Sequence, residues 1–520
     1  MIGRRPDPSA ISVRTVHAQR RIMWLLGGCL VALAGLVLLA FGRSSSVGAS
    51  IALFVLLGAV VAAGIRPVLG VYAIVFLTMV GDNVTSEWFP FAKNLSAKES
   101  LLYLSNQFFL SPLEILVGAT LLFFFIGRIG AQPRQPLVKG PLYWAIALFT
   151  VFVLFGFMYG LAKGGDPRVA LYEGRHMFMI LPVYLLIVNL CDRTTLWRLA
   201  WTAVVAIYIN VFLALLYLAN LSPLDRESLE ALGEHASAVH WNVLILLPLV
   251  AFLYRSSQAW TRLVLVAMLF PVGLAYLTAQ RRASVAGLVG AIAVVMLTLW
   301  WHNRARFMVI VPILAVVTAG YTAAFWNSQS SAGFPAQAIK TIIAPDSVSE
   351  ADQGSDLFRE IENFDLNFTI RAAPVFGLGF GHEFYRPIEL PDISFFEFYR
   401  YIPHNSILWV WVKTGFFGFA SMLLMFAVAM RAAGQTIITR IDAASKGMAL
   451  IGLCYVMMYV IYAFVDIGWD PRSMVFLALS FALCTQIERE KPPSEDRDED
   501  EAEAEPIAWQ AQTPASPELA

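Results

Sequence analysis

The stretch PHNSILWVWVKTGFFGF (Pro403–Phe419) places a histidine and an asparagine at the mouth of an otherwise apolar run. The run continues to residue 430, which is long enough to cross the roughly 30 Å hydrocarbon core of a bilayer. Because backbone N–H and C=O groups find no water in lipid, such a run is expected to form an α-helix. The stretch therefore predicts a membrane helix with a titratable side chain at one end.

Many other segments of the chain share this apolar character. Of its 520 residues, 58% are hydrophobic and 14% are charged, whereas a soluble domain is nearer to half apolar and a quarter charged. The sequence predicts an all-α polytopic membrane protein with about 12–14 transmembrane helices, because 241–254 and 473–487 are short and 47–82 allows a different path. The candidate segments are 22–41, 47–64, 67–82, 108–127, 141–160, 175–191, 197–220, 241–254, 262–280, 283–301, 307–325, 405–430, 447–465 and 473–487.

The distribution of charge predicts the topology. With a cytoplasmic, basic N-terminus (1–21) and fourteen spans, the inside loops read RIGAQPRQPLVKG, CDRTTLWR, YRSSQAWTR, HNRAR and RAAGQTIITRIDAASK. All are basic, as the positive-inside rule requires. The same threading predicts helices 1–11 in 22–325, a long periplasmic loop at 326–404 and helices 12–14 in 405–487. The tail, 488–520, is acidic and proline-rich, and we expect it to be disordered in the cytoplasm.

The polar residues offer no metal or nucleotide site. The glycine-rich GLGFG (Gly377–Gly381) is not followed by the Gly-Lys-Ser/Thr of a phosphate-binding loop. The net charge of zero predicts no acidic partner such as nucleic acid. No His, Cys and Asp cluster has metal-ligand spacing, and the cysteines, which lie in or beside apolar runs, indicate no disulfide framework. They are Cys29, Cys191, Cys454 and Cys484.

Several basic side chains fall together on the outer face of this topology. Arg175 begins one span, Arg281 and Arg282 form a short turn between two spans, and His404 precedes another. Arginines in a short outer loop run against the positive-inside rule and are costly unless something uses them. The arginine fork suits phosphate oxygens, and imidazole suits proton transfer near neutrality. These residues predict an outward-facing site for a membrane-embedded diphosphate; the alternatives are a helix-capping His404 and arginines that snorkel to headgroups.

The same residues carry a resemblance to a known family. PHNSILWVWVKTGFFGF resembles the H-N-x-x-L…G-x-x-G signature of the O-antigen ligase and polymerase superfamily, and PVFGLGFGHEF is similar to its P-x-x-G-x-G-x-G-x-F segment. FREIENFDLNFTIRAAP resembles the arginine-bearing helix that precedes it, with Arg359 at the arginine. LTAQRRASVAGLVGAI is similar to the T-x-S-R-G segment, with Arg281 at the arginine. Gln280 replaces the serine and Arg282 the glycine, so which of the two arginines faces the site stays open.

The resemblance covers roughly Arg262 to Gly418. It implies a multi-pass enzyme of the bacterial inner membrane that transfers a glycan from undecaprenyl diphosphate on the periplasmic face, with no metal, cofactor or nucleotide. The acceptor is a lipid or a glycan, and membrane lipids surround the protein. The roles it implies are diphosphate binding by Arg175, Arg281 and Arg359 with Arg282 as the alternative to Arg281, general-base catalysis by His404, and orientation of the base or a sugar contact by Asn405.

Three activities remain open from the sequence. A ligase would attach the glycan to lipid A core, and thus make lipopolysaccharide, or to a similar acceptor. A polymerase would join carrier-linked repeat units. A flippase or transporter of the lipid-linked glycan would need charged groups deeper in the membrane, and Lys413 and Glu114 are the residues that it would use.

Overall fold

The structure, a computed structural model, describes most of the chain between Val47 and Gln486. Among the described residues every regular element is a helix and no strand occurs, which confirms the predicted all-α fold for this part of the chain. The expected N-terminal segment, the expected span 22–41 and the acidic tail lie outside it. The described residues are 47–81, 91–93, 95, 109–130, 136–222, 232–233, 236–254, 259–328, 330–344, 347, 350–390, 397–440 and 442–486.

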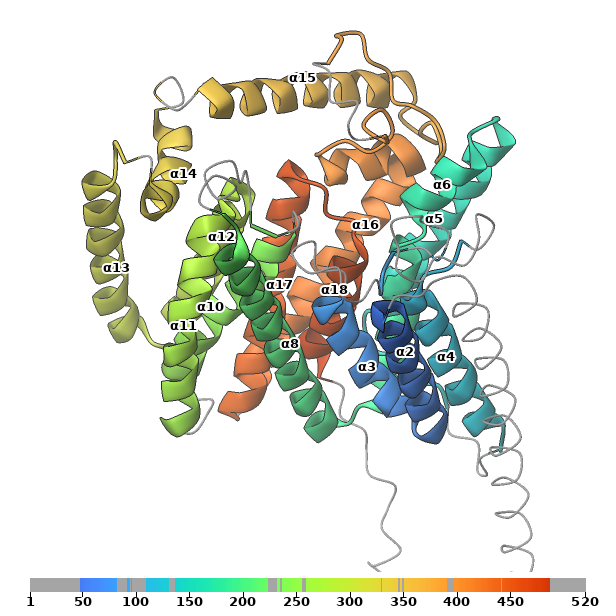
Figure 1. The fold of residues 1–520 in the computed structure, drawn as a ribbon, viewed down its shortest axis with the longest axis horizontal. Helices are drawn as coiled ribbons and strands as arrows, with labels where there is room; N and C mark the ends of the chain where they lie inside the picture. The colour runs from blue at the N-terminus through green and yellow to red at the C-terminus, as the bar shows by residue number, and fades with distance from the viewer. Residues whose placement is uncertain are drawn as a thin grey trace, which may run out of the picture. The chain divides into compact units, whose positions relative to one another are not determined.

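The helices follow the apolar segments of the sequence in order (Figure 1). They are α2 (Val47–Ile65), α3 (Pro67–Val80), α4 (Pro112–Gly130), α5 (Tyr143–Ala162), α6 (Pro167–Gly174), η1 (Met177–Met179), α7 (Ile180–Leu190), α8 (Arg193–Asn220), α10 (Ser237–Tyr254), α11 (Ala259–Ala279), α12 (Arg282–His302), α13 (Arg304–Ala324), η2 (Ser331–Gly333), α14 (Phe334–Ile343), α15 (Glu350–Ala372), α16 (Ser406–Thr439), α17 (Ala443–Val465) and α18 (Pro471–Thr485).

The lengths of these helices fit a membrane protein. Within the described residues, nine helices are long and apolar enough to cross a membrane, and the bent pair of α6 with η1 and α7 makes a tenth, with an angle of 46° between its halves. Shorter apolar helices lie at 51–65, 67–80 and 471–485. Every expected segment from residue 47 onward coincides with a helix. The chain is therefore a multi-pass, all-α membrane protein, as predicted.

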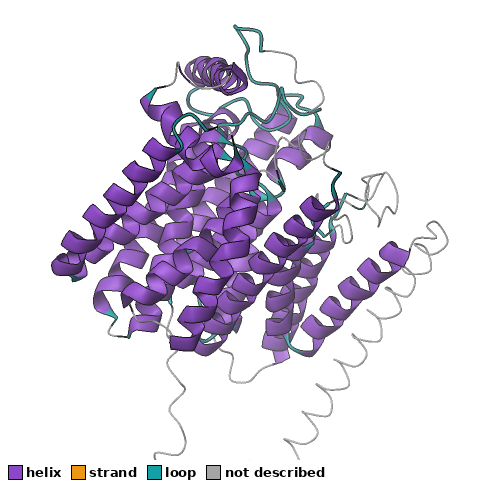
Figure 2. Cartoon of the chain, turned by 60° about the vertical axis from the view of Figure 1, so that its left-hand side comes forward, coloured by secondary structure: helices purple, strands orange, loops and turns teal. Residues whose placement is uncertain are grey.

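The long helix α16 organises the bundle. It packs against α5, α17 and α18, and α15 packs against it as well. Figure 2 shows the helices running side by side, with the longer connections gathered at one end of them. In Figure 1, α14 and α15 lie at that end, and α15 crosses it almost at right angles to the bundle. The start of α16 belongs to this end, and His404 comes just before it.

A glycine-rich loop, residues 374–382, passes between α5 and α16 and is named the glycine loop below. Gly379 has a φ of 83°, and a Cβ there would lie 2.4 Å from the Cα of Gly160 in α5. Gly415, at a break inside α16, has a φ of 70°, and a Cβ there would lie 2.0 Å from the carbonyl oxygen of Val375. Only glycine tolerates both the backbone conformation and the close approach at these crossings.

The glycine loop is fixed by hydrogen bonds to the helices around it. The Leu378 N–H donates to the carbonyl of Val412 at 2.7 Å, and the Gly381 N–H donates to the Glu173 carboxylate at 2.6 Å. That carboxylate also lies 2.7 Å from the Lys413 ammonium, which donates to the carbonyl of His382. The side chains of Glu173 and Lys413 are fully buried. One ion pair thus joins α6, α16 and the loop.

We expect Lys413→Met to destabilise the protein, because it leaves the Glu173 carboxylate buried without its cation. Removal of one partner of a buried pair typically costs about 3–5 kcal/mol. Thermal unfolding of the purified protein in detergent measures the effect as a lower Tm. The double variant Lys413→Met with Glu173→Gln carries no buried charge and should recover most of the lost Tm. An unchanged Tm in the single variant would show that the pair adds no stability.

Candidate active site

His404 is held by a carboxylate from α15. Its backbone N–H donates to Oε2 of Glu362 at 2.9 Å, and its ring Nδ1 lies 3.3 Å from Oε1 of the same side chain. Glu362 is 2% exposed, whereas the His404 side chain is 25% exposed. Because Nδ1 faces the carboxylate, Nε2 is the ring nitrogen left for a reaction partner. A carboxylate in this position fixes the orientation of the ring and stabilises its protonated form.

The surroundings of His404 set its proton affinity. Burial alone would lower the pKa of the imidazole, but the hydrogen bond and charge of Glu362, with the charge of Asp466, outweigh burial and the opposing charge of Arg359. The net effect raises the pKa of His404 above its ordinary value of 6.5. The imidazole is therefore a stronger base than a free histidine, and it is neutral only above this raised pKa.

Two adjacent residue pairs dock α15 onto the start of α16. Besides the Glu362–His404 pair, Nδ2 of Asn405 donates to Oδ1 of Asn363 at 2.8 Å. Oδ1 of Asn405 accepts from the N–H of Leu408 at 3.0 Å and so caps α16. Both polar ends of this amide are engaged inside the protein, and Asn405 is 2% exposed. Its geometry is that of a residue that positions its neighbour His404.

Arg282 and Arg359 are brought together by one carboxylate. Both terminal nitrogens of Arg282 donate to Asp356 at 3.0 Å, and Nη1 of Arg359 lies 3.6 Å from the same carboxylate. Arg359 also donates to the hydroxyl of Ser355 at 2.9 Å. Arg282 begins α12, whereas Arg359 lies on α15, one turn before Glu362. Helix α15 therefore contacts both the basic cluster and the histidine.

Arg281 sits at the turn between α11 and α12. It is the N-cap residue of α12, and Gln280 before it has a φ of 50°, a left-handed conformation that is strained for a non-glycine residue. The Nε atoms of Arg281 and Arg359 are buried and make no hydrogen bond among the described residues. A buried N–H donor without a partner is costly, and an anionic oxygen is the partner that suits it.

Arg175 lies in a different environment from these arginines. It follows α6 at the bend before η1, and its guanidinium forms a buried ion pair with Glu114 of α4. Nε donates to Glu114 at 2.9 Å, and Nη1 donates to the carbonyl of Phe109 at 3.0 Å. Glu114 thus balances the charge of Arg175 inside the protein. The sequence did not predict this pairing for a residue that was expected to bind phosphate.

The sequence missed the acidic residues of the site. Glu362 and Asp356 stand in a segment with many charges, and the pattern of that segment did not show which acids turn inward. A signal existed in the helical spacing: Phe358, Glu362 and Leu366 recur every four residues, all are buried, and Phe358 contacts the His404 ring edge-on at 5.5 Å. An acid on the apolar face of an amphipathic helix is a candidate for pairing with a base.

The site consists of acidic and basic side chains. Among the described residues, no group of three His, Cys, Asp or Glu side chains is placed to hold a metal ion. The available functional groups are an imidazole, two carboxylates and three guanidinium groups. They can move a proton and bind an anion.

Comparison with known proteins identifies a family over part of the chain. No curated protein matches the chain. Residues 263–423 match the sequence model of the family described as O-antigen ligase. This range runs from α11 to the middle of α16 and includes Arg281, Arg282, Arg359, Glu362 and His404. Over this range, which is less than a third of the chain, the sequence is similar to the O-antigen ligase family, and this similarity supports the predicted relation to the O-antigen ligase superfamily.

Proposed function

We propose that this protein is a metal-independent glycosyltransferase that moves a glycan from undecaprenyl diphosphate to an acceptor hydroxyl on the periplasmic face of the bacterial inner membrane. The family supports glycan transfer of the O-antigen ligase or polymerase kind. The observation that carries the proposal is that His404 is held by Glu362 of α15. Arg359 lies one helical turn before Glu362 and shares Asp356 with Arg282. A base and an anion-binding cluster at this spacing suit displacement of a diphosphate by a hydroxyl.

The reaction needs one proton transfer and one bond exchange. Nε2 of His404 takes the proton of the acceptor hydroxyl while the oxygen attacks the anomeric carbon of the glycan. The bond from that carbon to the diphosphate oxygen breaks, and the carrier diphosphate leaves with its electron pair. Glu362 stabilises the imidazolium, which afterwards returns its proton to solvent. Because the donor is already activated, catalysis rests on orientation and on stabilisation of charge at the leaving group.

The arginines divide into two proposed roles. Arg281 and Arg359 bind the diphosphate directly, because each has a buried Nε without a hydrogen bond among the described residues. Arg282 supports Arg359 through Asp356 and is the alternative ligand. Arg175 would reach a phosphate only by sharing or releasing Glu114. Asn405 positions His404 by capping α16.

The ligase activity is preferred, with the polymerase as its alternative, since both use the same donor. A deletion strain distinguishes them: a ligase leaves intact carrier-linked chains that are not attached to lipid A core, whereas a polymerase leaves single repeats. A flippase is less well supported. Lys413 and Glu114, the charges that it would need, form buried ion pairs with Glu173 and Arg175.

We expect the end of the bundle that carries His404 to face the periplasm. Helix α16 runs roughly 50 Å from His404 to Arg440 at the usual rise per residue, and at the far end Arg193 pairs with Asp442. Basic residues favour the cytoplasmic side. Reporter fusions should read cytoplasmic after Arg440 and periplasmic near Ser355. The reverse result would separate the site from a periplasmic donor and rule out the proposed reaction.

Removal of the base should block glycan transfer and leave donor binding intact. A general base contributes about 10²–10⁴-fold, so we expect His404→Ala and His404→Gln to lower glycan transfer by that factor in proteoliposomes. Carrier-linked donor should still bind, because the arginines remain. An active His404→Gln protein would assign His404 to hydrogen bonding only.

The pH profile tests the carboxylate. Transfer should rise with pH through the raised pKa of His404, because only the neutral ring accepts a proton. Glu362→Gln removes the charge that favours the imidazolium, so the pKa falls and the rising limb moves to lower pH, with a lower maximal rate. The measurement is transfer from pH 5 to 8 under conditions where chemistry is rate-limiting. The same midpoint in both proteins would mean that Glu362 does not act on the base.

Substitution of the neighbouring arginines tests which one faces the donor. We expect Arg281→Ala to cause a large loss of transfer at normal protein level, and Arg281→Lys to cause a partial loss because lysine lacks the bidentate fork. Arg282→Ala is the matched control one residue away. If Arg282→Ala is inactive and Arg281→Ala is fully active, the two roles are exchanged.

A further inference from the structure

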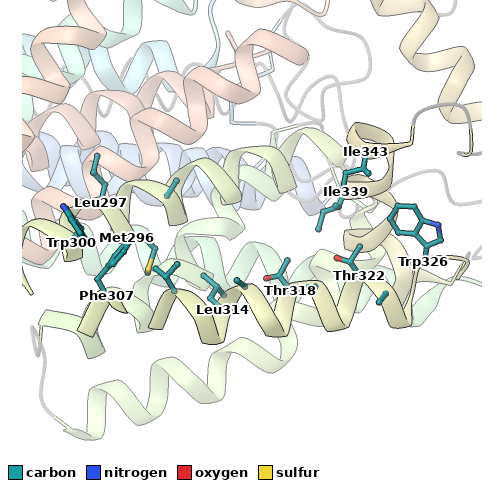
Figure 3. A pocket seen from close by; sticks show the side chains of 15 residues that line it. Met296, Leu297, Trp300, Phe307, Leu314, Thr318, Thr322, Trp326, Ile339 and Ile343 are labelled. Carbon is teal, nitrogen blue, oxygen red and sulfur yellow. The ribbon is translucent and has the colours of Figure 1, made fainter. Parts of the chain in front are cut away.

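A long apolar groove runs along the side of α13 that faces α12 and α14. It has a volume of about 1150 Å³ and is formed by α12, α13 and α14 together with Trp326 (Figure 3). Its lining side chains are apolar or aromatic apart from two threonines, Thr318 and Thr322. Helix α13 contributes little to the core of the bundle, since only 6% of its 18-residue apolar stretch is buried. The groove thus lies where lipid chains would surround the protein.

The shape of the groove follows from the sequence of α13. The lining positions recur every three or four residues from Phe307 to Thr322, so they form one face of the helix. At the usual rise per residue they span roughly 22 Å. The small residues Ala315 and Ala319 lie between larger ones and leave the face hollow. A groove of this length and volume has room for a single extended hydrocarbon chain.

One end of the groove adjoins buried positive charge. There α14 presents Ile339 and Ile343 to the groove, and its Thr341 lies 3.4 Å from Nη1 of Arg282. The neighbouring Lys340 is 8% exposed, and its ammonium lies 5.5 Å from the centre of the Trp326 ring. No carboxylate of the described residues forms an ion pair with Lys340.

The opposite end of the groove carries an exposed charge in place of a buried one. Trp300 lies there beneath the exposed Arg304, and it is separated by the length of α13 from the arginines that share Asp356.

We propose that this groove holds the polyprenyl chain of the donor lipid, with its diphosphate directed past Lys340 to the arginine cluster on α12 and α15. This inference rests on the proposed function. The occupant is an amphiphile with one long hydrocarbon chain and an anionic head, because the groove is a single apolar path and one of its ends adjoins the buried Lys340 and the arginines that share Asp356. The cation at the other end, Arg304, is exposed. The surrounding lipid is as apolar as the groove, so moving the polyprenyl chain into the groove adds little binding affinity. Packing in the groove instead sets the position of the chain. It fixes the anomeric carbon relative to His404.

Photolabelling of the wild-type protein tests the location of the chain. The probe is undecaprenyl diphosphate with a diazirine in its hydrocarbon chain, and the control is a phospholipid with a diazirine in one acyl chain, each in liposomes. The polyprenyl probe should label groove residues such as Met296 and Leu314 at least tenfold more than Ile313 and Val316 on the other face of α13. The phospholipid should label both faces. Equal labelling of both faces by the polyprenyl probe, or groove labelling by phospholipid only, overturns the proposal.

Matched variants give a second readout. Ala315→Trp fills the groove, whereas Val316→Trp adds the same side chain one residue away, outside the lining. We expect Ala315→Trp to lower groove labelling and glycan transfer at least tenfold and Val316→Trp to change neither. Lys340→Met should lower groove labelling, and Lys340→Arg should retain it. Equal labelling in Ala315→Trp and wild type contradicts the proposal.

The two proposals fail in different ways. Groove labelling by the polyprenyl probe without any glycan transfer would contradict the proposed function and leave a carrier-lipid site. Transfer by wild type with no preferential groove labelling would keep the proposed function and reject the groove as the place of the chain.

Discussion

The glycine loop is irregular backbone inside a helical membrane bundle, so each amide that it buries needs a partner within the protein. Those partners include the Val412 carbonyl of α16, the Gly156 carbonyl of α5 and the Glu173 carboxylate, whose charge Lys413 balances. The loop follows α15 directly and is locked against the break at Gly415 in α16. The ion pair and the glycine crossings thereby fix α15 relative to the start of α16. The contact between Glu362 and His404 depends on that placement.

Among the described residues, the arginine cluster on α12 and α15 carries more positive charge than the carboxylate paired with it. Arg281, Arg282 and Arg359 carry three positive charges, and Asp356 is the carboxylate that pairs with two of these side chains. A diphosphate supplies the anionic oxygens that such a cluster lacks. One helical turn further along α15, Glu362 acts on the histidine. One helix thus connects charge stabilisation at the leaving group with activation of the acceptor. Lys340 would extend the positive charge toward the apolar groove.

The lengths of the apolar runs predicted the helices well because bilayer thickness imposes a length and a composition on each span. Each segment expected from residue 47 onward is a helix, including the short α18. The break at Gly415 was not predicted, because its cause is the approach of Val375 from a segment 40 residues earlier. Apolar runs alone do not show such crossings.

The candidate site was predicted in part for a similar reason. His404 and Arg281 were proposed because charge is rare at the ends of apolar helices, and Arg359 was proposed from the family resemblance. Their carboxylate partners were not found, because Glu362 and Asp356 stand in a polar segment where acids are common and pair across 42 and 74 residues. The pairing of Arg175 with Glu114 spans 61 residues and was missed likewise. Pairing between distant segments is a property of the fold.

The most direct test of the central claim is a single-turnover experiment on purified protein in liposomes that contain a chelator. The donor is a glycan on undecaprenyl diphosphate, labelled in both glycan and carrier, and the acceptor is present in excess. The account predicts that free undecaprenyl diphosphate and the glycosylated acceptor appear at the same rate and in a one-to-one ratio. Movement of the intact donor across the bilayer with no release of carrier diphosphate would contradict it.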